Sequence, residues 1–427
     1  MSPAKELHVL LMGQQAAIAR KGAGGRLSLT YTPEWQASEN AQSMSLSLPY
    51  TQDEHTHRPV SAFLAGLLPE SVEILRGWAT EFSVSPDNAF ALLAHMGEDC
   101  AGAVQFVREE RLDEVMRSRG TIEPLTEEEI ADALARIRRN APPWVDADDQ
   151  RGMFSLAGAQ AKIALAQTQT GWGRPSGRAA STHILKPPTN PQLPGIETNE
   201  HVCLSLARRL GVPAAASHVQ RFGDEIAIIV QRFDRRADET GVARLHQEDT
   251  CQALGIPPER KYQGHGGPGF AEMAGLAEAH SADPEADFQR ILGAAAVNWI
   301  IGGTDAHAKN YSWYLTSGDQ VLMTPLYDLI SALPYYPVDN QLRMAMPIGG
   351  ENRIVHVRQA EWERLADVLG ADPAEVVGYV RDLLHHVPAA LGAVVDDAAG
   401  AGLDAAVLKR LHADILTNVE RCKLLLC

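Results

Sequence analysis

Three polar side chains in the second half of the chain have the types and the order that phosphoryl transfer requires. Asp305 comes first, Asn310 follows in the same short segment, and Asp328 lies after a β-prone stretch. One carboxylate can orient an attacking hydroxyl group and accept its proton, while an amide oxygen and a second carboxylate hold magnesium against nucleotide phosphates. Mg²⁺ prefers hard oxygen ligands and takes few protein groups. The arrangement therefore predicts a kinase site, with Asp305 as its catalytic carboxylate.

The segment before Asp305 indicates how this residue is held. Residues 294–301 are apolar and predict a buried helix. Gly302 and Gly303 follow, and glycines at such a place end a helix and release the chain into a loop. We therefore expect Asp305 in a loop directly after a buried helix.

Two β-prone runs after this loop, residues 311–315 and 321–324, predict a hairpin. Because a hairpin returns its second strand to the place where the first began, we expect Asp328 near Asn310. The alternative is that Asp305 and Asn310 only cap the loop and that Asp328 only forms a turn. Asp305, Asn310 and Asp328 together favour a magnesium site over that alternative.

A second candidate segment spans residues 154–165 and is rich in small side chains. Around Gly158, main-chain N–H groups could approach a phosphate closely, and Ser155 beside them could contact the phosphate or receive it. The GxxxxGK[ST] pattern of a Walker loop is absent. The segment predicts a phosphate-side loop, and a plain strand, turn and strand is the alternative.

Lys186 stands at the end of the β-prone run 182–186, which two prolines close. A lysine there can pair with the α- and β-phosphates of a nucleotide. Glu200 begins a helix that would hold the lysine in position. The alternative is an ordinary exposed lysine at a strand end.

The apolar run 225–230 predicts a buried strand, and Gln231, Arg232 and Phe233 follow it. In kinase architecture a strand at this place leads to the hinge between the lobes. The hinge backbone meets the adenine edge, while apolar side chains enclose the ring.

Length and composition are those of an enzyme with two or three packed subdomains. The chain has 427 residues and is 45% hydrophobic, which is enough for a large core. Its net charge of −16 argues against a broad nucleic-acid surface, because phosphate neutralisation requires clustered Lys and Arg.

No signal peptide or membrane-spanning run is expected, so the predicted compartment is the cytoplasm. The five cysteines are too scattered for disulfides or a metal site and are predicted to be reduced thiols.

Periodicity predicts further elements on both sides of these segments. Strands are expected over residues 7–12, 26–31 and 44–48, and helices over 60–75, 88–95, 361–369 and 372–384. The run Thr126-Glu127-Glu128-Glu129 is a capping box and predicts a helix start. The sequence Asn-Ala-Pro-Pro at 140–143 would end that helix, and we place a subdomain boundary there.

Taken together, these segments resemble the HipA family of bacterial toxin serine/threonine kinases. The similarity runs from near the start of the chain to about residue 350. The matching segments are residues 32–35, 45–49, 67–69, 155–162, Lys186, 231–235, 246–249, 261–262, 266–269, 304–310 and 327–328. The combination is far more specific than any one of its parts.

The resemblance implies an α+β fold, two-lobed and protein-kinase-like, with a small β-rich amino-terminal HipA-type subdomain and a helical carboxy-terminal lobe. Residues 1–110 would form the amino-terminal subdomain, 111–235 the kinase N-lobe region with the phosphate loop and the nucleotide lysine, and 236–427 the helical C-lobe with the catalytic loop. The implied cofactors are ATP and Mg²⁺, with Asp305 catalytic and Asn310 and Asp328 as metal ligands. The implied nucleotide-binding residues are Ala157, Gly158, Ala159, Gln160, Ala161, Lys162, Lys186, Gln231, Arg232, Phe233, His307, Lys309, Asn310 and Asp328.

The resemblance also implies regulation and partners. Ser155 matches the family's autophosphorylation position, where phosphate ejects the loop from the site and switches the kinase off; a dianionic group cannot comfortably occupy the space of ATP phosphates. The implied partners are a small helix-turn-helix antitoxin of the HipB type and a protein substrate such as an aminoacyl-tRNA synthetase or another translation factor. DNA would be contacted only indirectly, through the antitoxin, and the pair would repress its own operon.

Two departures from the family pattern affect details of binding. The family's loop commonly has Glu-Lys-Thr where this chain has Ala161-Lys162-Ile163, and its hinge commonly begins with Glu where this chain has Gln231.

Two other functions stay open beside the protein kinase. One is a small-molecule phosphotransferase of similar lobe plan, which the additional amino-terminal domain and Ser155 disfavour. The other is a non-enzymatic co-repressor beside an antitoxin, which would not need Asn310 and Asp328.

Overall fold

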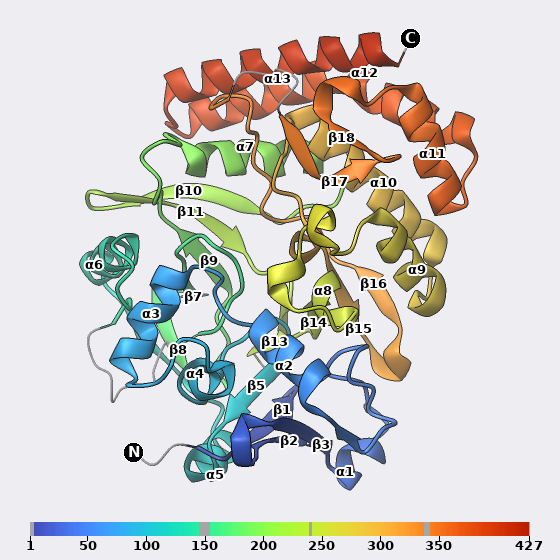
Figure 1. The fold of residues 1–427 in the computed structure, drawn as a ribbon. Coiled ribbons are helices and arrows are strands. Elements are labelled where there is room, and N and C mark those ends of the chain that lie inside the picture. The colour runs from blue at the N-terminus through green and yellow to red at the C-terminus, as the bar shows by residue number, and fades with distance from the viewer. Residues whose placement is uncertain (1–3, 145–153, 239–240, 337–341, 427) are drawn as a thin grey trace. The chain divides into compact units, whose positions relative to one another are not determined.

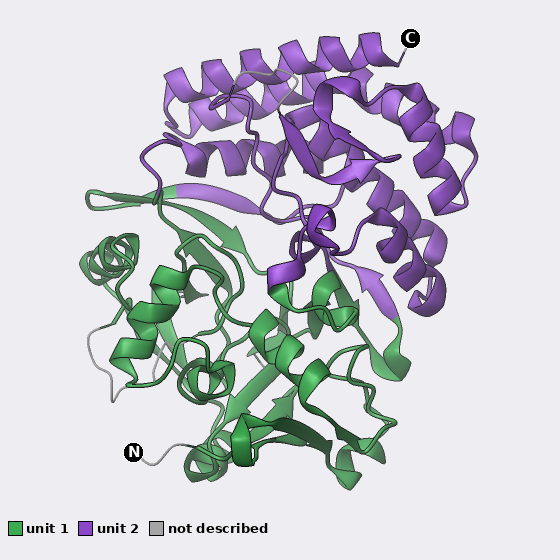
Figure 2. Cartoon of the chain, viewed as in Figure 1, with its two compact units in different colours: residues 1–189, 220–258, 313–320 green, residues 190–219, 259–312, 321–427 purple. Residues whose placement is uncertain are grey.

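The computed structural model describes residues 4–144, 154–238, 241–336 and 342–426. Two compact units are present, coloured separately in Figure 2. Unit 1 comprises residues 1–189, 220–258 and 313–320, and unit 2 comprises residues 190–219, 259–312 and 321–427. The fold is α+β, as predicted. The three-part division expected from the sequence, 1–110, 111–235 and 236–427, stays a prediction.

The first part of unit 1 is a five-stranded antiparallel sheet in the order β4-β3-β2-β1-β5. Its strands are β1 (Glu6–Leu11), β2 (Gln14–Lys21), β3 (Leu27–Tyr31), β4 (Glu54–His55) and β5 (Val104–Val107). Buried and half-buried residues alternate along β3, as expected for a strand with one face on a core. The helices that accompany this sheet are α1 (Pro33–Gln36), α2 (His57–Gly66), α3 (Val72–Glu81), α4 (Ala89–Met96) and α5 (Glu109–Arg117).

A second sheet of unit 1 carries the predicted nucleotide residues, in the order β10-β11-β9-β7-β8-β6. Its strands are β6 (Thr121–Pro124), β7 (Ile163–Thr168), β8 (Gly171–Ser176), β9 (His183–Lys186), β10 (Ser217–Phe222) and β11 (Glu225–Gln231). Residues 217–219 of β10 are assigned to unit 2. Helix α6 (Glu127–Arg138) begins at the predicted capping box, which is confirmed on Thr126 and Glu129. One apolar core extends from the first sheet to Ile163, Leu185 and Ile229 of this one.

The remaining elements of unit 1 are short. They are β12 (Arg235–Asp238), β13 (Gly241–Arg244), β14 (Gln247–Asp249), α8 (Thr250–Ala253) and most of β15 (Ser312–Leu315), with 3-10 turns at Ala23–Gly25 and Ser317–Asp319. Asp249 caps α8 through the N–H of Gln252, and the side chain of Gln252 caps Asp249 in return. The polar residues at the start of α8 thus cap this helix.

Unit 2 is mainly helical, and its two long helices, α12 and α13, lie side by side (Figure 1). Its helices are α7 (Ile196–Arg209), α9 (Phe270–His280), α10 (Pro284–Ile301), α11 (Gln359–Leu369), α12 (Pro373–Gly400) and α13 (Ala405–Leu425). Its strands are β16 (Val321–Met323), β17 (Arg343–Ile348) and β18 (Glu351–Arg353), and 3-10 turns occur at Gln263–His265, Ala308–Asn310 and Ile354–His356.

Helix α10 forms the centre of unit 2. Every residue from Ile291 to Ile301 is buried, as the apolar run predicted. The Trp299 indole donates to the Ile354 carbonyl over 3.0 Å, and the Asn418 amide of α13 donates to the carbonyls of Trp299 and Ile300. These bonds hold the end of α10, which leads directly into the predicted catalytic loop.

Several predicted elements are wrong in their bounds. Residues 44–48 form turns and an isolated bridge rather than a strand. The helix expected over 60–75 is two helices, because Pro69 lies between α2 and α3 and cannot donate to a helical hydrogen bond. Strand β2 and helix α13 were not predicted, and α12 continues well beyond residue 384.

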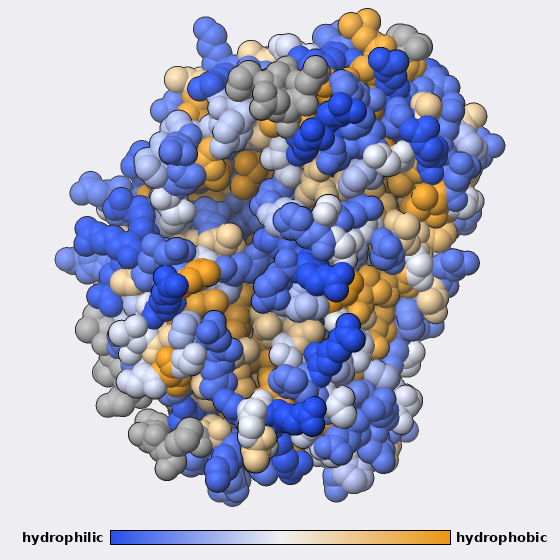
Figure 3. All heavy atoms as spheres, viewed as in Figure 1, coloured by the Kyte–Doolittle hydropathy of each residue, from blue (hydrophilic) through white to orange (hydrophobic). Residues whose placement is uncertain are grey.

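Cys100, Cys203, Cys251 and Cys422 are free, while Cys427 lies outside the described residues. Within residues 4–144, 154–238, 241–336 and 342–426, no cluster of three or more His, Cys, Asp or Glu side chains could hold a metal ion. In the same residues, every helix is too short or too polar to cross a membrane. The face shown in Figure 3 is largely hydrophilic, with hydrophobic side chains in separate patches.

Glu248 of unit 1 is a buried carboxyl group whose removal should stabilise the protein at alkaline pH. Its Oε1 accepts the Leu46 N–H over 2.9 Å, and burial raises the pKa of Glu248 to about 8. Since the folded pKa lies above the unfolded value, stability is lost as pH rises between those two values, and the loss is complete above pH 8. Glu248→Gln keeps an acceptor for Leu46, so we expect a gain on the order of 2 kcal/mol at pH 9 and little change at pH 4.

Thermal unfolding at the two pH values measures this effect. Glu81→Gln, at an exposed position on α3, is the matched control and should change the unfolding temperature equally at both. A gain from Glu248→Gln that does not depend on pH would contradict the prediction.

Candidate active site

The loop that carries Asp305 begins where α10 ends. Gly302 has φ +67° and caps the helix, and a Cβ atom there would lie 2.6 Å from the Leu333 side chain. Gly303 is equally confined, because a Cβ atom would lie 2.4 Å from Oδ1 of Asn298. A larger residue at either position would displace these neighbours. The predicted helix, its glycine stop and the loop after it are confirmed.

Hydrogen bonds within the loop fix Asn310 against Asp305. The main-chain N–H of His307 donates to the Asp305 carbonyl over 2.9 Å, and that of Asn310 donates to the His307 carbonyl over 2.9 Å. The side-chain Nδ2 of Asn310 donates to the Asp305 carbonyl over 3.0 Å. With its nitrogen engaged in this way, the amide of Asn310 presents Oδ1 as the group that can bind a cation.

The hairpin predicted after the loop is present and brings the two predicted metal ligands into one region of unit 2. The Thr324 N–H donates to the Ser312 carbonyl over 2.9 Å. The hydroxyl of Tyr327, directly before Asp328, donates to the Lys309 carbonyl over 2.7 Å and accepts from the Ser312 hydroxyl over 2.6 Å. Asp328 itself has φ +57°, a left-handed conformation that is uncommon for a residue other than glycine and is often found at functional sites.

These groups fit a magnesium ion shared with a nucleotide. Asn310 and Asp328 could contribute oxygen ligands, which Mg²⁺ prefers, and Mg²⁺ usually takes its other ligands from water and phosphates. His307 and Lys309 are buried beside Asn310, at 4% and 5% exposure, whereas Asp305 is exposed. The carboxylate of Asp305 is therefore accessible to a substrate hydroxyl group.

Tyr262 is a residue of this site that sequence reasoning did not assign. Its hydroxyl donates to Oδ1 of Asp305 over 2.7 Å, and its ring meets the His307 ring edge-on at 5.1 Å. The Ala308 N–H donates to the carbonyl of Lys261, which ties the two segments together. The only available signal was the match of residues 261–262 to the family, because the spacing of 43 residues gives no local pattern.

Removing the Tyr262 hydroxyl should slow phosphoryl transfer without weakening nucleotide binding. Tyr262→Phe leaves Asp305 free to rotate, so we expect kcat to fall on the order of tenfold, or about 1.4 kcal/mol of transition-state stabilisation. The KM for ATP should stay within twofold. Tyr336→Phe, at an exposed position of the same unit, is the control. Equal kcat values for Tyr262→Phe and the wild type would show that Tyr262 does not position Asp305.

The predicted phosphate-side segment of unit 1 is held by local bonds. Gly158 has φ +113°, and a Cβ atom there would lie 2.5 Å from Nζ of Lys162, so glycine is required. Lys162 donates to the Ala157 carbonyl over 2.5 Å, and the Gln160 amide donates to the Pro187 carbonyl over 3.2 Å. Ala159 and Ala161 belong to the same irregular stretch before β7.

Ser155 is fully buried in this structure. Its Oγ donates to the Leu67 carbonyl over 2.9 Å, and its N–H donates to the Asp99 carbonyl over 2.9 Å. The hydroxyl group is therefore not accessible to a phosphoryl donor in this conformation. Sequence alone gave no indication of this burial.

The other predicted nucleotide residues of unit 1 lie on neighbouring strands. Lys186 ends β9 and is 7% exposed, and β9 pairs with β11, which ends at Gln231. The Arg232 guanidinium is turned into the unit, where Nε donates to Asp234 over 2.9 Å. The Phe233 carbonyl accepts from the Tyr314 hydroxyl over 2.9 Å. Arg232 is thus engaged inside the unit, and an adenine contact through the Phe233 carbonyl would be shared with Tyr314.

Comparison with known proteins places this site in a family. A model described as HipA-like C-terminal domain matches residues 154–391, and one described as HipA N-terminal domain matches residues 7–107. The chain is 34% identical over 402 residues to the putative kinase Y4mE of Sinorhizobium fredii, covering 94% of each chain. It is 31% identical over 418 residues to the serine/threonine-protein kinase toxin HipA of Shewanella oneidensis, covering 92% of this chain and 91% of that protein.

A solved structure gives the same result. The chain matches a chain in the complex of Shewanella oneidensis MR-1 HipA with HipB and operator DNA, with a TM-score of 0.80 and 27% identity over 97% of both chains. The predicted two-lobed kinase-like fold is thereby confirmed. The protein is a kinase, and the chain belongs to the HipA family.

Proposed function

We propose that the protein transfers the γ-phosphoryl group of ATP to a serine hydroxyl of another protein. The observation that carries this proposal is the set of bonds that fix Asn310 to Asp305 and Tyr327 to Lys309, since they bring one base and two oxygen ligands into one region. ATP with Mg²⁺ would supply the phosphoryl group and neutralise the charge that develops on it.

The side chains of the chain would then divide the chemistry. The exposed carboxylate of Asp305 accepts the proton of the attacking serine hydroxyl, and Tyr262 orients that carboxylate. Asn310 and Asp328 hold the metal ion. Lys186 pairs with the α- and β-phosphates, and the N–H groups around Gly158 approach the phosphate chain.

We further propose that the kinase inactivates itself by phosphorylating Ser155. The buried hydroxyl must first leave its bonds to Leu67 and Asp99, and a phosphate group could not return to that space. Burial of a dianion without a charged partner is strongly unfavourable, so the modified segment would stay displaced. Displacement of residues 155–162 removes the phosphate-side loop from the nucleotide site.

The partners are proposed from the solved structure that this chain matches. The matched Shewanella structure is a complex of HipA, HipB and operator DNA, which supports a HipB-like helix-turn-helix antitoxin for this chain and DNA contact through it. Co-repression would be a second function of that assembly. An aminoacyl-tRNA synthetase or another translation factor in the cytoplasm is the proposed substrate.

Incubation with γ-labelled ATP and Mg²⁺, followed by mass spectrometry of the chain and of lysate proteins, tests these proposals. We expect phosphate on Ser155 of the wild type, and continued labelling of lysate protein by Ser155→Ala with a longer active period. Ser317→Ala, at an exposed position, is the control and should lose activity with time like the wild type. Label found on small metabolites and never on protein would favour the small-molecule phosphotransferase instead.

A further inference from the structure

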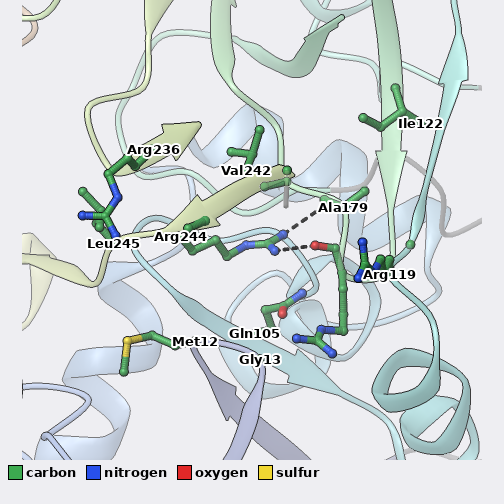
Figure 4. A pocket seen from close by; sticks show the side chains of 15 residues that line it. Met12, Gly13, Gln105, Arg119, Ile122, Ala179, Arg236, Val242, Arg244 and Leu245 are labelled. Atoms are coloured by element: carbon green, nitrogen blue, oxygen red, sulfur yellow. Dashed lines mark hydrogen bonds between the residues drawn. The ribbon is translucent and has the colours of Figure 1, made fainter. Parts of the chain in front are cut away.

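Unit 1 contains a cavity of about 870 Å³ that shares no lining residue with the predicted nucleotide site (Figure 4). Four arginines line it: Arg119 before β6, Arg178 after β8, Arg236 on β12 and Arg244 on β13. Its lining, as far as the chain is described, includes no aspartate, glutamate or lysine. The cavity is therefore suited to an anionic ligand.

Within the described residues, carboxylates do not balance all of the positive charge on the cavity wall. Among the described residues, no hydrogen bond or ion pair engages the guanidinium groups of Arg119, Arg178 and Arg236. Arg244 belongs to a buried cluster in which it, Arg232 and Arg235 face two carboxylates, Asp99 and Asp234. Three guanidinium groups against two carboxylates leave a positive charge next to the cavity.

Arg244 also has an unused hydrogen-bond donor. Its side chain is 7% exposed, and its terminal nitrogens donate to the carbonyls of Arg178 and Ala179, drawn as dashed lines in Figure 4, and to Asp99. Its Nε is buried and has no partner in the part of the chain that the structure describes. A buried donor without an acceptor is unfavourable, so the contacts of Arg244 in the described residues do not satisfy it fully.

The cavity is bordered by an open strand edge. Strand β13 pairs with β12 on one side, and the two form a sheet of their own. Residues 241–245, which are all of β13 and Leu245, line the cavity one after another. The Leu245 N–H donates to the Asp234 carbonyl, so the alternation of an antiparallel pair directs the main-chain N–H and C=O groups of Val242 and Arg244 away from β12.

We propose that β13 and the four arginines bind an extended acidic peptide segment of a partner protein by strand addition. An edge strand offers a row of main-chain donors and acceptors for a further strand. Side chains of the added strand alternate between its faces, so acidic residues at every second position would lie on the side of the arginines. Four arginines around one cavity suit a short acidic segment rather than nucleic acid, which needs an extended basic surface.

Fluorescence anisotropy with a labelled peptide of alternating aspartate and valine, ten residues long, tests the site at low ionic strength. The wild type should bind it saturably. The pair of substitutions Arg178→Glu and Arg236→Glu should weaken binding at least tenfold, and Arg236→Glu alone, at an exposed position, should weaken it severalfold without affecting folding. Arg58→Glu, an exposed arginine of the same unit outside the cavity, should leave the affinity within twofold of the wild type.

Two further probes show whether the peptide binds as an added strand or only through its negative charge. N-methylation of every second residue removes the main-chain N–H donors along one edge of the peptide. Two such peptides exist, one for each edge. One of the two should bind at least tenfold more weakly than the unmethylated peptide. An oligothymidylate of equal charge should bind more weakly than the peptide. Equal binding of both methylated peptides, tighter binding of the oligonucleotide, or no saturable binding by the wild type would overturn the proposal.

Discussion

Replacing Asp305 by asparagine should lower the rate of phosphoryl transfer on the order of 10³-fold while leaving the protein folded. The substitution removes the proposed proton acceptor but keeps the size of the side chain, and general-base catalysis contributes about 10²–10⁴-fold. Asp305 is exposed, and among the described residues its side chain accepts a hydrogen bond from Tyr262, which an amide oxygen can also accept. The measurement is the initial rate with γ-labelled ATP, together with thermal unfolding.

Asp396→Asn is the matched control for this prediction. Asp396 is an exposed aspartate of α12 in the same unit, and its substitution should leave both rate and stability unchanged. A variant with Asp305→Asn that retains more than a tenth of the wild-type rate would mean that another group accepts the proton.

Replacing Asp99 by alanine should destabilise unit 1 by about 3–5 kcal/mol, because it breaks a buried ion-pair cluster. Asp99 is 7% exposed at its side chain and lies 2.9 Å from Arg235, 3.2 Å from Arg244 and 3.6 Å from Arg232. Without it, three buried guanidinium groups face a single carboxylate. Urea unfolding of the variant measures the loss. Asp113→Ala, which breaks an ion pair whose aspartate is 84% exposed, should change stability by less than about 0.5 kcal/mol.

The pH dependence of the same variant gives a second readout. Burial by itself would raise the pKa of Asp99, but the guanidinium groups of Arg232, Arg235 and Arg244 outweigh it and hold that pKa below its usual range. A carboxylate with a depressed folded pKa contributes stability that is present above its unfolded pKa and is lost as pH falls toward the folded pKa. The difference between wild type and Asp99→Ala should therefore shrink between pH 6 and pH 3. A difference that stays constant over this range would contradict the ion-pair explanation.

The parts of the site that follow from local sequence were predictable. The helix before Asp305, its glycine stop and the hairpin after Asn310 each arise from a few consecutive residues, so periodicity and turn chemistry suffice. Strand β2 was missed because its sequence, Gln-Gln-Ala-Ala-Ile-Ala-Arg-Lys, has little β-propensity. It becomes a strand by pairing with β1 and β3 on both sides.

Contacts between distant segments were not predictable. Tyr262 reaches Asp305 across 43 positions, and Ser155 is buried by Leu67 and Asp99, which belong to separate segments. Arg232 was predicted in a hinge whose backbone meets the adenine, and the burial of its guanidinium against Asp234 and Asp99 was not foreseen. No spacing rule in the sequence encodes such pairings, since they depend on how the sheets and helices pack.

Electron paramagnetic resonance of Mn²⁺, used in place of Mg²⁺ with a non-hydrolysable ATP analogue, tests the two oxygen ligands most directly. We predict nucleotide-dependent Mn²⁺ binding by the wild type. This binding should weaken at least tenfold in both Asn310→Ala and Asp328→Asn and should be unchanged in Asp396→Asn. Wild-type affinity in both ligand variants would contradict it.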